Sequence, residues 1–225
     1  MVIGGHAADA EVMAGALVLK HRRAGWQPVF VHMTPGEKGH PRLSAAEYLT
    51  QKRQEAEAAA TAFGGIQVMM PWGDGELPVN DEVQWAIADT IREHRPEVIV
   101  THWRGSMHKD HRNTHDNVME ALFYAALPAF QRRHPAHRAR AVYYAENWED
   151  PTGFEPSVYV DVTEVFPDYL QAIQAYELFR GGISSFPYAR YYDALGTTRG
   201  CLGGYEKAVA LMTPPGTGRR KLDLL

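Results

Sequence analysis

The chain has 225 residues, enough for one large domain that buries its own core. Apolar residues make up 45% of the chain and charged residues 22%, and the formal net charge of −4 excludes the basic surface that binds nucleic acids or acidic membranes. The single cysteine excludes an internal disulfide, and no apolar run approaches the roughly 20 residues of a membrane helix. The segment from Met1 to His6 lacks the pattern of a signal peptide, so we expect a cytoplasmic protein.

The first half of the chain alternates short apolar runs with helical patterns. The predicted strands cover 1–5, 28–33, 66–70 and 97–101, and the predicted helices cover 11–24, 44–63, 80–94 and about 113–127. This β-α-β-α order predicts an α/β fold with a Rossmann-like, mainly parallel sheet and helices on both of its faces. In such folds the ligand site lies at the carboxyl ends of the strands.

The second half of the chain is less regular. Its apolar pattern predicts strands at 141–146 and 157–162, helices at 163–179 and 205–212, and an aromatic, Gly-rich loop at 181–192. We predict a single domain over 1–213. The C-terminal tail, 214–225, has little to bury and is predicted to be mobile.

Two polar clusters follow the first and fourth predicted strands. The first contains His6 and Asp9, and the second contains His108, Asp110 and His111. Imidazole nitrogens and carboxylate oxygens suit zinc or another divalent transition ion, and three protein ligands would leave room for water and substrate. The spacing alone equally allows a helix-capping role for Asp9 and solvated histidines.

The order and spacing of several motifs resemble those of the LmbE-like, or PIG-L, family of N-deacetylases. The six residues from His6 to Glu11 resemble the family's opening motif, and the four from His108 to His111 resemble its second histidine motif. Other similar segments are Thr34 to Gly39, Arg53 with Glu55, Gly73 to Gly75, and Arg199 to Glu206. The resemblance covers most of the chain and is weakest from about 128 to 200.

The resemblance implies a role for each of the matching residues. Zinc would be bound by His6, Asp9 and His111. His108 would polarise the scissile carbonyl or protonate the leaving amine, with Asp110 holding it. Three further residues would contact the substrate or line the mouth of the site, namely Arg53, Asp74 and Glu37.

The resemblance also implies a substrate class and an assembly. The family removes acetyl groups from N-acetylglucosamine conjugates, so we expect a small amide or amino-sugar conjugate as substrate and a homo-oligomer as the assembly. Ligand type alone does not separate zinc from iron. Lys109 stands where the family has proline, and it either favours an anionic substrate or is simply solvated.

One position departs from the family motif. The family's catalytic base is an aspartate at the position that Ala8 occupies here, and an alanine accepts no proton. Three hypotheses follow: an engineered inactive variant, a natural variant whose base is another carboxylate, or a protein that binds a metal or sugar without hydrolysis. The candidates for a replacement base are Glu37, Glu11 and Asp110. A hydrolase that removes a different acyl group is a further alternative.

Overall fold

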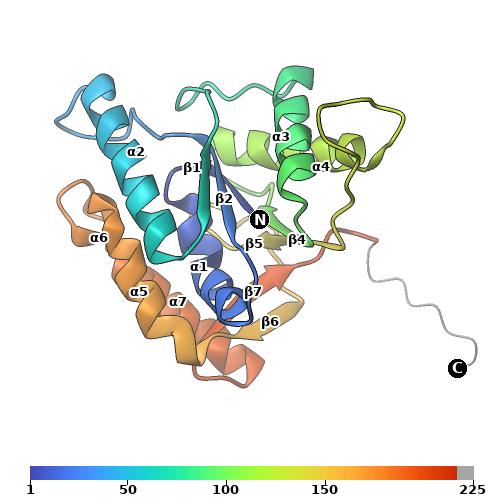
Figure 1. Cartoon of the computed structure of the whole chain (residues 1–225). Helices are drawn as coiled ribbons and strands as arrows, with labels where there is room; N and C mark the ends of the chain where they lie inside the picture. The colour runs from blue at the N-terminus through green and yellow to red at the C-terminus, as the bar shows by residue number, and fades with distance from the viewer. Residues whose placement is uncertain (217–225) are drawn as a thin grey trace, which may run out of the picture.

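The computed structural model describes residues 1–216, and these form a seven-stranded sheet in the order β3-β2-β1-β4-β5-β7-β6 (Figure 1). The strands are β1 (Val2–His6), β2 (Val29–Thr34), β3 (Ile66–Met69), β4 (Val98–His102), β5 (Ala141–Ala145), β6 (Val158–Asp161) and β7 (Ala208–Met212). The strands from β3 to β5 are parallel, whereas β7 is antiparallel to both neighbours. The carboxyl ends of β1, β2, β3, β4 and β5 therefore lie along one edge of the sheet.

Helices cover both faces of the sheet. They are α1 (Asp9–Arg23), α2 (Ala45–Ala62), α3 (Asp81–His94), α4 (Lys109–Ala126), α5 (Phe166–Ala172), α6 (Glu177–Arg180) and α7 (Tyr188–Gly203), with short 3-10 turns at Thr163–Val165 and Ile173–Ala175. Buried residues of α3 and α4, such as Ile87 and Val118, form one core cluster, while those of α1, α2, α5 and α7 form the other (Figure 1). The predicted fold class is confirmed.

The second half of the chain differs from its predicted elements. The helix predicted at 205–212 is wrong, because Gly204 ends α7 in a left-handed conformation and Ala208–Met212 pairs as β7 with β6 and β5. An apolar run this short fits a strand as well as a helix. The single helix predicted at 163–179 is broken into short turns, and the loop predicted at 181–192 gives way to α7 at Tyr188.

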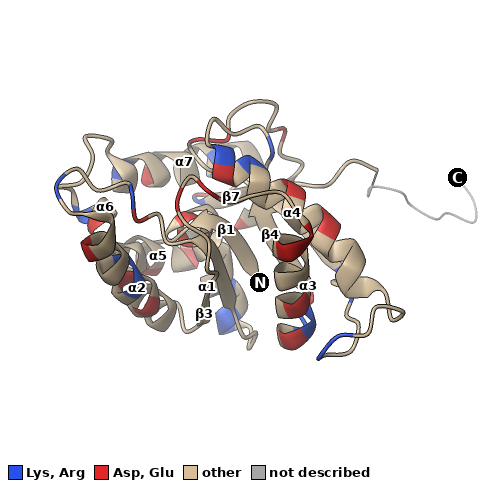
Figure 2. Cartoon of the chain, turned by 90° about the horizontal axis from the view of Figure 1, so that it is seen from above, with Lys and Arg blue, Asp and Glu red and all other residues tan. Residues whose placement is uncertain are grey.

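The starts of α1 and α4 matter most for the site. The first helix begins at Asp9, and α4 begins at Lys109 because the side chain of His108 accepts a hydrogen bond from the backbone N–H of Asp110. Both α2 and α3 carry acidic and basic residues (Figure 2). Within the described residues, no helix combines the length and apolarity that crossing a membrane requires. Most of the tail predicted at 214–225 lies outside the described residues.

Candidate active site

A cavity of ≈ 190 Å³ lies at the carboxyl edge of the sheet, where the loops after β1, β2, β3, β4 and β5 meet. Its lining residues are His6, Ala7, Ala8, Asp9, Gly36, Gly39, Tyr48, Lys52, Asp74, His108, Trp148, Glu149, Leu178, Ile183 and Tyr188. The lining combines histidines and carboxylates on one part with aromatic and aliphatic side chains on another. The position agrees with the site predicted from the strand order.

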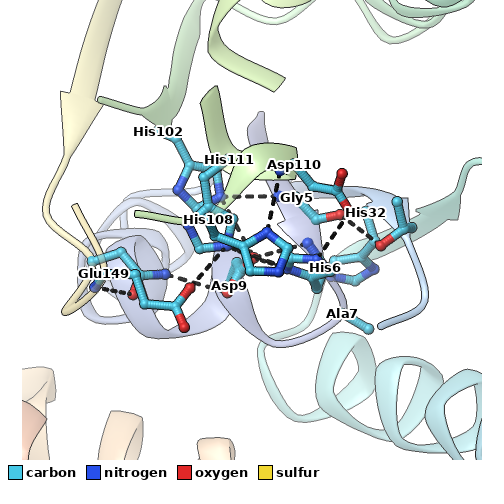
Figure 3. A network of polar contacts seen from close by, with 12 residues as sticks. Gly5, His6, Ala7, Asp9, His32, His102, His108, Asp110, His111 and Glu149 are labelled. Atoms are coloured by element: carbon cyan, nitrogen blue, oxygen red, sulfur yellow. Dashed lines mark hydrogen bonds and ion pairs between the residues drawn. The ribbon is translucent and has the colours of Figure 1, made fainter. Parts of the chain in front are cut away.

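The three predicted metal ligands converge beside this cavity, which His6 and Asp9 line (Figure 3). His6 Nδ1 lies 3.0 Å from Asp9 Oδ2, His111 Nε2 lies 2.9 Å from the same oxygen, and the two nitrogens are 3.2 Å apart. Zinc bonds of about 2.0–2.1 Å in a tetrahedral arrangement place ligand atoms about 3.3 Å apart. The three atoms therefore fit around one zinc ion with little movement.

The partners of the histidines determine which nitrogens carry lone pairs. His111 Nδ1 lies 3.0 Å from Asp150 Oδ1, so Nδ1 donates and Nε2 is left with a lone pair toward Asp9. His6 Nε2 lies 3.3 Å from Asp74 Oδ1 and 3.3 Å from Asp110 Oδ2 without a hydrogen bond to either, and His6 Nδ1 faces Asp9 Oδ2. Two ring nitrogens and a carboxylate oxygen that face one another are of the atom types that suit a divalent transition metal ion.

The electrostatics of the cluster also call for a cation. Burial lowers the pKa of the His111 imidazole, but the carboxylates of Asp9 and Asp150 outweigh burial and raise that pKa to about 9. Burial opposes ionisation of Asp150, but His102 and His111 outweigh it and lower its pKa to about 2. The buried carboxylates thus stabilise positive charge between them, either as protons or as a metal ion.

Local backbone geometry brings His6 and Asp9 to the same point. His6 ends β1, and Ala8 turns the chain in a left-handed conformation with φ 101° before α1 begins at Asp9. The backbone N–H of His6 donates to Asp9 Oδ2 at 2.8 Å. Gly5 permits the approach of α4, because a Cβ at this position would lie 2.8 Å from His111 Cδ2.

His102 lies beside the ligands without being available as one. Its Nε2 accepts the backbone N–H of Gly5 at 2.9 Å, and its Nδ1 lies 2.8 Å from Asp150 Oδ2. The lone pair of Nε2 is therefore used by the backbone. Asp150 is fully buried, and its two carboxylate oxygens contact Nδ1 of His102 and Nδ1 of His111. The rings of these two histidines stack on each other. Carboxylates that hold a metal-binding histidine in this way raise its basicity and fix its ring.

The loop after β5 contributes further contacts that sequence reasoning missed. Asn147 Nδ2 donates to Asp9 Oδ1 at 3.2 Å, and Tyr192 in turn donates to Asn147 Oδ1 at 3.2 Å. Glu149 Oε2 lies 3.5 Å from His111 Nε2 (Figure 3). Burial raises the pKa of the Glu149 carboxyl, against the opposing effect of His111. The available signal was a run of acidic and amide residues, 146–150, directly after a predicted strand.

His108 and Asp110 are close to the site but not paired as expected. Asp110 Oδ2 accepts the backbone N–H of Gly75 at 2.6 Å and approaches His6, while no contact between the carboxylate and the His108 ring occurs among the described residues. His108 Nδ1 instead accepts the backbone N–H of Asp110 at 3.2 Å. This leaves the proton of the neutral ring on Nε2 in a side chain that lines the cavity.

The remaining predicted residues occupy different positions. Asp74 lines the cavity, and Glu37 holds the Asp74 loop by accepting the backbone N–H of Asp74 at 3.1 Å. Arg53 is exposed and does not line the cavity, whereas its neighbour Lys52 does. Glu11 is buried against His32 and Tyr176. Of the carboxylates along the cavity, Glu149 is the one that sequence reasoning did not consider.

Comparison with known proteins agrees with these features. Residues 1–122 match the model of the family described as PIG-L, GlcNAc-PI de-N-acetylase. The diacetylchitobiose deacetylase of Thermococcus kodakarensis is 25% identical over 232 residues, covering 94% of this chain and 81% of that protein. The 4-oxalmesaconate hydratase of Pseudomonas putida is 24% identical over 183 residues, covering 77% of this chain and 71% of that protein.

A solved structure shares the whole fold. The 4-carboxy-2-hydroxymuconate hydratase of Pseudomonas putida superposes with a TM-score of 0.87 at 21% identity, covering 100% of this chain and 98% of that one. At this identity the likeness establishes the fold and leaves the reaction open. The named relatives thus include both deacetylases and hydratases.

Proposed function

Because the chain belongs to the PIG-L family, we propose that it is a metal-dependent hydrolase that removes an N-acyl group, such as acetyl, from a glucosamine-type conjugate or similar small amide. The observation that carries the proposal is the convergence of His6 Nδ1, Asp9 Oδ2 and His111 Nε2 beside an open cavity. These three residues would hold the ion. Bound zinc would supply Lewis acidity that lowers the pKa of water toward roughly 7.

The other residues have separate tasks in the proposed reaction. His108 donates through Nε2 to the carbonyl oxygen as negative charge develops there, because its Nδ1 already accepts a backbone hydrogen bond. After attack, the proton that a nearby carboxylate base takes from water would pass to the leaving amine, because a neutral His108 that gave up its single N–H proton would become an imidazolate. Asp150 holds His111 and Asp110 approaches His6, so both rings stay oriented without moving during the reaction.

Glu149 is our candidate for the base that Ala8 lacks. It is a carboxylate along the cavity, its Oε2 is 3.5 Å from His111 Nε2, and it is not one of the three proposed ligands. A carboxylate with a raised pKa accepts a proton more readily than an ordinary glutamate at neutral pH. This supports the hypothesis of a natural variant with a relocated base over an inactive or purely binding protein.

The test is amine release from N-acetylglucosamine and its glycosides by the zinc-loaded protein. We expect turnover that disappears with a chelator and returns with zinc. Ala8→Asp restores the family's acid and is expected to retain or raise the rate. A zinc-loaded, folded protein that releases no amine from any N-acyl substrate over long incubation, with or without Ala8→Asp, would sink the proposal.

A second candidate reaction is the addition of water to a carbon–carbon double bond conjugated to a carboxylate. It is favoured by Ala8, which departs from the deacetylase motif, together with the 24% identity to a 4-oxalmesaconate hydratase. The metal site would serve the same purpose of activating water. Loss of ultraviolet absorbance from an unsaturated dicarboxylate, without amine release from amides, would favour this reaction over deacylation.

The identity of the ion and the assembly are separate predictions. Nitrogen and carboxylate ligands accept zinc and iron alike, so metal analysis of protein purified without added metal is the appropriate measurement. The expected homo-oligomer stays a prediction, which light scattering on the purified protein would test.

A further inference from the structure

Lys52 is a buried cation at the edge of the proposed active site. It lies on α2, its exposed fraction is 4%, and it lines the same cavity as His6 and Asp9. Its Nζ donates to the carbonyl oxygen of Ala7 at 2.9 Å. The ammonium also lies 5.1 Å from the ring centroid of Tyr176 and 5.5 Å from that of Tyr48.

The charge of Lys52 is incompletely satisfied. An ammonium has three N–H donors, and among residues 1–216 only the Ala7 carbonyl accepts from it, with no carboxylate in an ion pair. Burial lowers the pKa of Lys52, and the more distant carboxylates of Glu55 and Asp9 oppose this effect. A buried ammonium without a counter-ion is costly unless a ligand supplies the missing acceptor.

A second lysine at the site provides a contrast. Lys38 is exposed, and its Nζ contacts Glu76 Oε1 at 2.6 Å and the carbonyl of Asp74 at 2.8 Å. Its charge is already paired and solvated, so it has no need of a ligand. Lys52 is enclosed by two aromatic rings and a backbone carbonyl, and the cavity is the side from which an acceptor could reach it.

We propose that Lys52 binds a carboxylate of the substrate, so that the site selects small molecules that bear a carboxylate at a fixed distance from the reacting group. The inference rests on the proposed metal-dependent site but not on which bond is cleaved. A carboxylate fits better than a phosphate, because Asp74 and Glu149 also line the cavity and repel a dianion more strongly. Lys52 would then be a substrate-binding residue, held in place by the carbonyl oxygen of Ala7.

The test measures binding by calorimetry on the zinc-loaded protein. The probes are pairs of equal carbon number: succinate with butyrate, glutarate with pentanoate, and adipate with hexanoate. Both members of a pair can bind the metal through one carboxylate. The gain in affinity from the second carboxylate of the diacid therefore measures its interaction with the Lys52 ammonium. We expect one diacid to bind at least about tenfold tighter than its monoacid partner.

Three variants assign that gain to Lys52. Lys52→Met removes the charge and is expected to abolish the gain, while Lys52→Arg keeps the charge and is expected to retain most of it. Lys20→Met is the matched control, because exposed Lys20 also donates to a backbone carbonyl, that of Asp161, and does not line the cavity. It is expected to leave the gain unchanged.

The outcomes separate this inference from the proposed reaction. Equal affinity of every diacid and its monoacid in the wild-type protein overturns the inference, as does a gain that survives in Lys52→Met. If Lys52→Met does not fold, the affinities of the wild-type protein and of Lys52→Arg for the diacids and their monoacid partners still test the inference. Absence of amine release with a Lys52-dependent diacid gain would reject the deacylase while leaving the carboxylate site standing.

Discussion

The two halves of the molecule contribute differently to the same site. The first half, which carries the family match, supplies all three proposed ligands, from the end of β1 and the first turns of α1 and α4. The loop after β5, residues 146–150, supplies the atoms that orient those ligands and a carboxylate along the cavity. The first half would therefore bind the metal ion, and residues 146–150 would orient its ligands.

The largest effect is expected from the first half. Replacing His111 with Ala removes a lone pair from the ligand set, so we expect loss of bound zinc and a fall in kcat/KM of at least about 10³-fold. Metal analysis after gel filtration, alongside amine release, provides the measurement. An H111A protein that keeps a stoichiometric zinc ion and full activity would show that the ion lies elsewhere.

The next largest effect is expected from Glu149. Glu149→Gln keeps the shape but accepts no proton, so we expect kcat to fall about 10²–10⁴-fold while zinc content is unchanged. Adding Ala8→Asp to this variant should recover much of the loss, because the acid returns at the family position. Glu155→Gln, an exposed acid farther along the same segment, is the control. If E149Q keeps the wild-type kcat, Glu149 is not the base.

A smaller effect is expected from Asp150. Asp150→Asn weakens the hydrogen bonds to His111 and His102, so we expect zinc affinity to fall about 10–100-fold. Competition with a chromophoric chelator measures the affinity directly. Unchanged affinity, with the protein still folded, would remove the loop after β5 from any role in metal binding.

The smallest effect is expected from Tyr192, which is linked to the proposed ligand Asp9 only through Asn147. Tyr192→Phe removes the donor to Asn147, which in turn holds Asp9. Loss of one buried hydrogen bond lowers the free energy of unfolding by about 0.5–1.5 kcal/mol, and we expect zinc affinity to change by less than about threefold. Urea denaturation and the chelator assay measure the two quantities. A fall in zinc affinity as large as that of D150N would mean that Asn147 matters as much as Asp150.

The difference between the two halves of the molecule also explains which parts of the site could be predicted from the sequence and which could not. His6, Asp9 and His111 belong to local motifs with a fixed spacing, so their convergence was predictable. Glu149 and Asp150 contact them only because β5 lies beside β4 in the sheet, and that pairing is a tertiary fact. The acidic and amide residues of 146–150 follow a predicted strand, but this pattern does not say which histidines the two acids meet.

Two wrong expectations about individual side chains have the same cause, because tertiary packing decides which side chains meet. Asp110 belongs to the histidine motif, yet its carboxylate, in the first turn of α4, approaches His6 and not His108. On α2, the cavity receives Lys52 and not the neighbouring Arg53, because which side of a helix faces a pocket depends on packing. The substrate contact predicted for Arg53 stays a prediction.

The left-handed turn at Ala8 has a consequence for how this chain can change. Its φ of 101° strains an alanine by about 1–2 kcal/mol, whereas glycine, asparagine and aspartate adopt such conformations more easily. An aspartate at position 8 would therefore relieve part of the backbone strain, but its carboxylate would be buried beside Asp9 and would need a cation to compensate its charge. The turn thus suits aspartate by its backbone and alanine by its burial, so the stability of an Ala8→Asp variant should depend on the concentration of the metal ion.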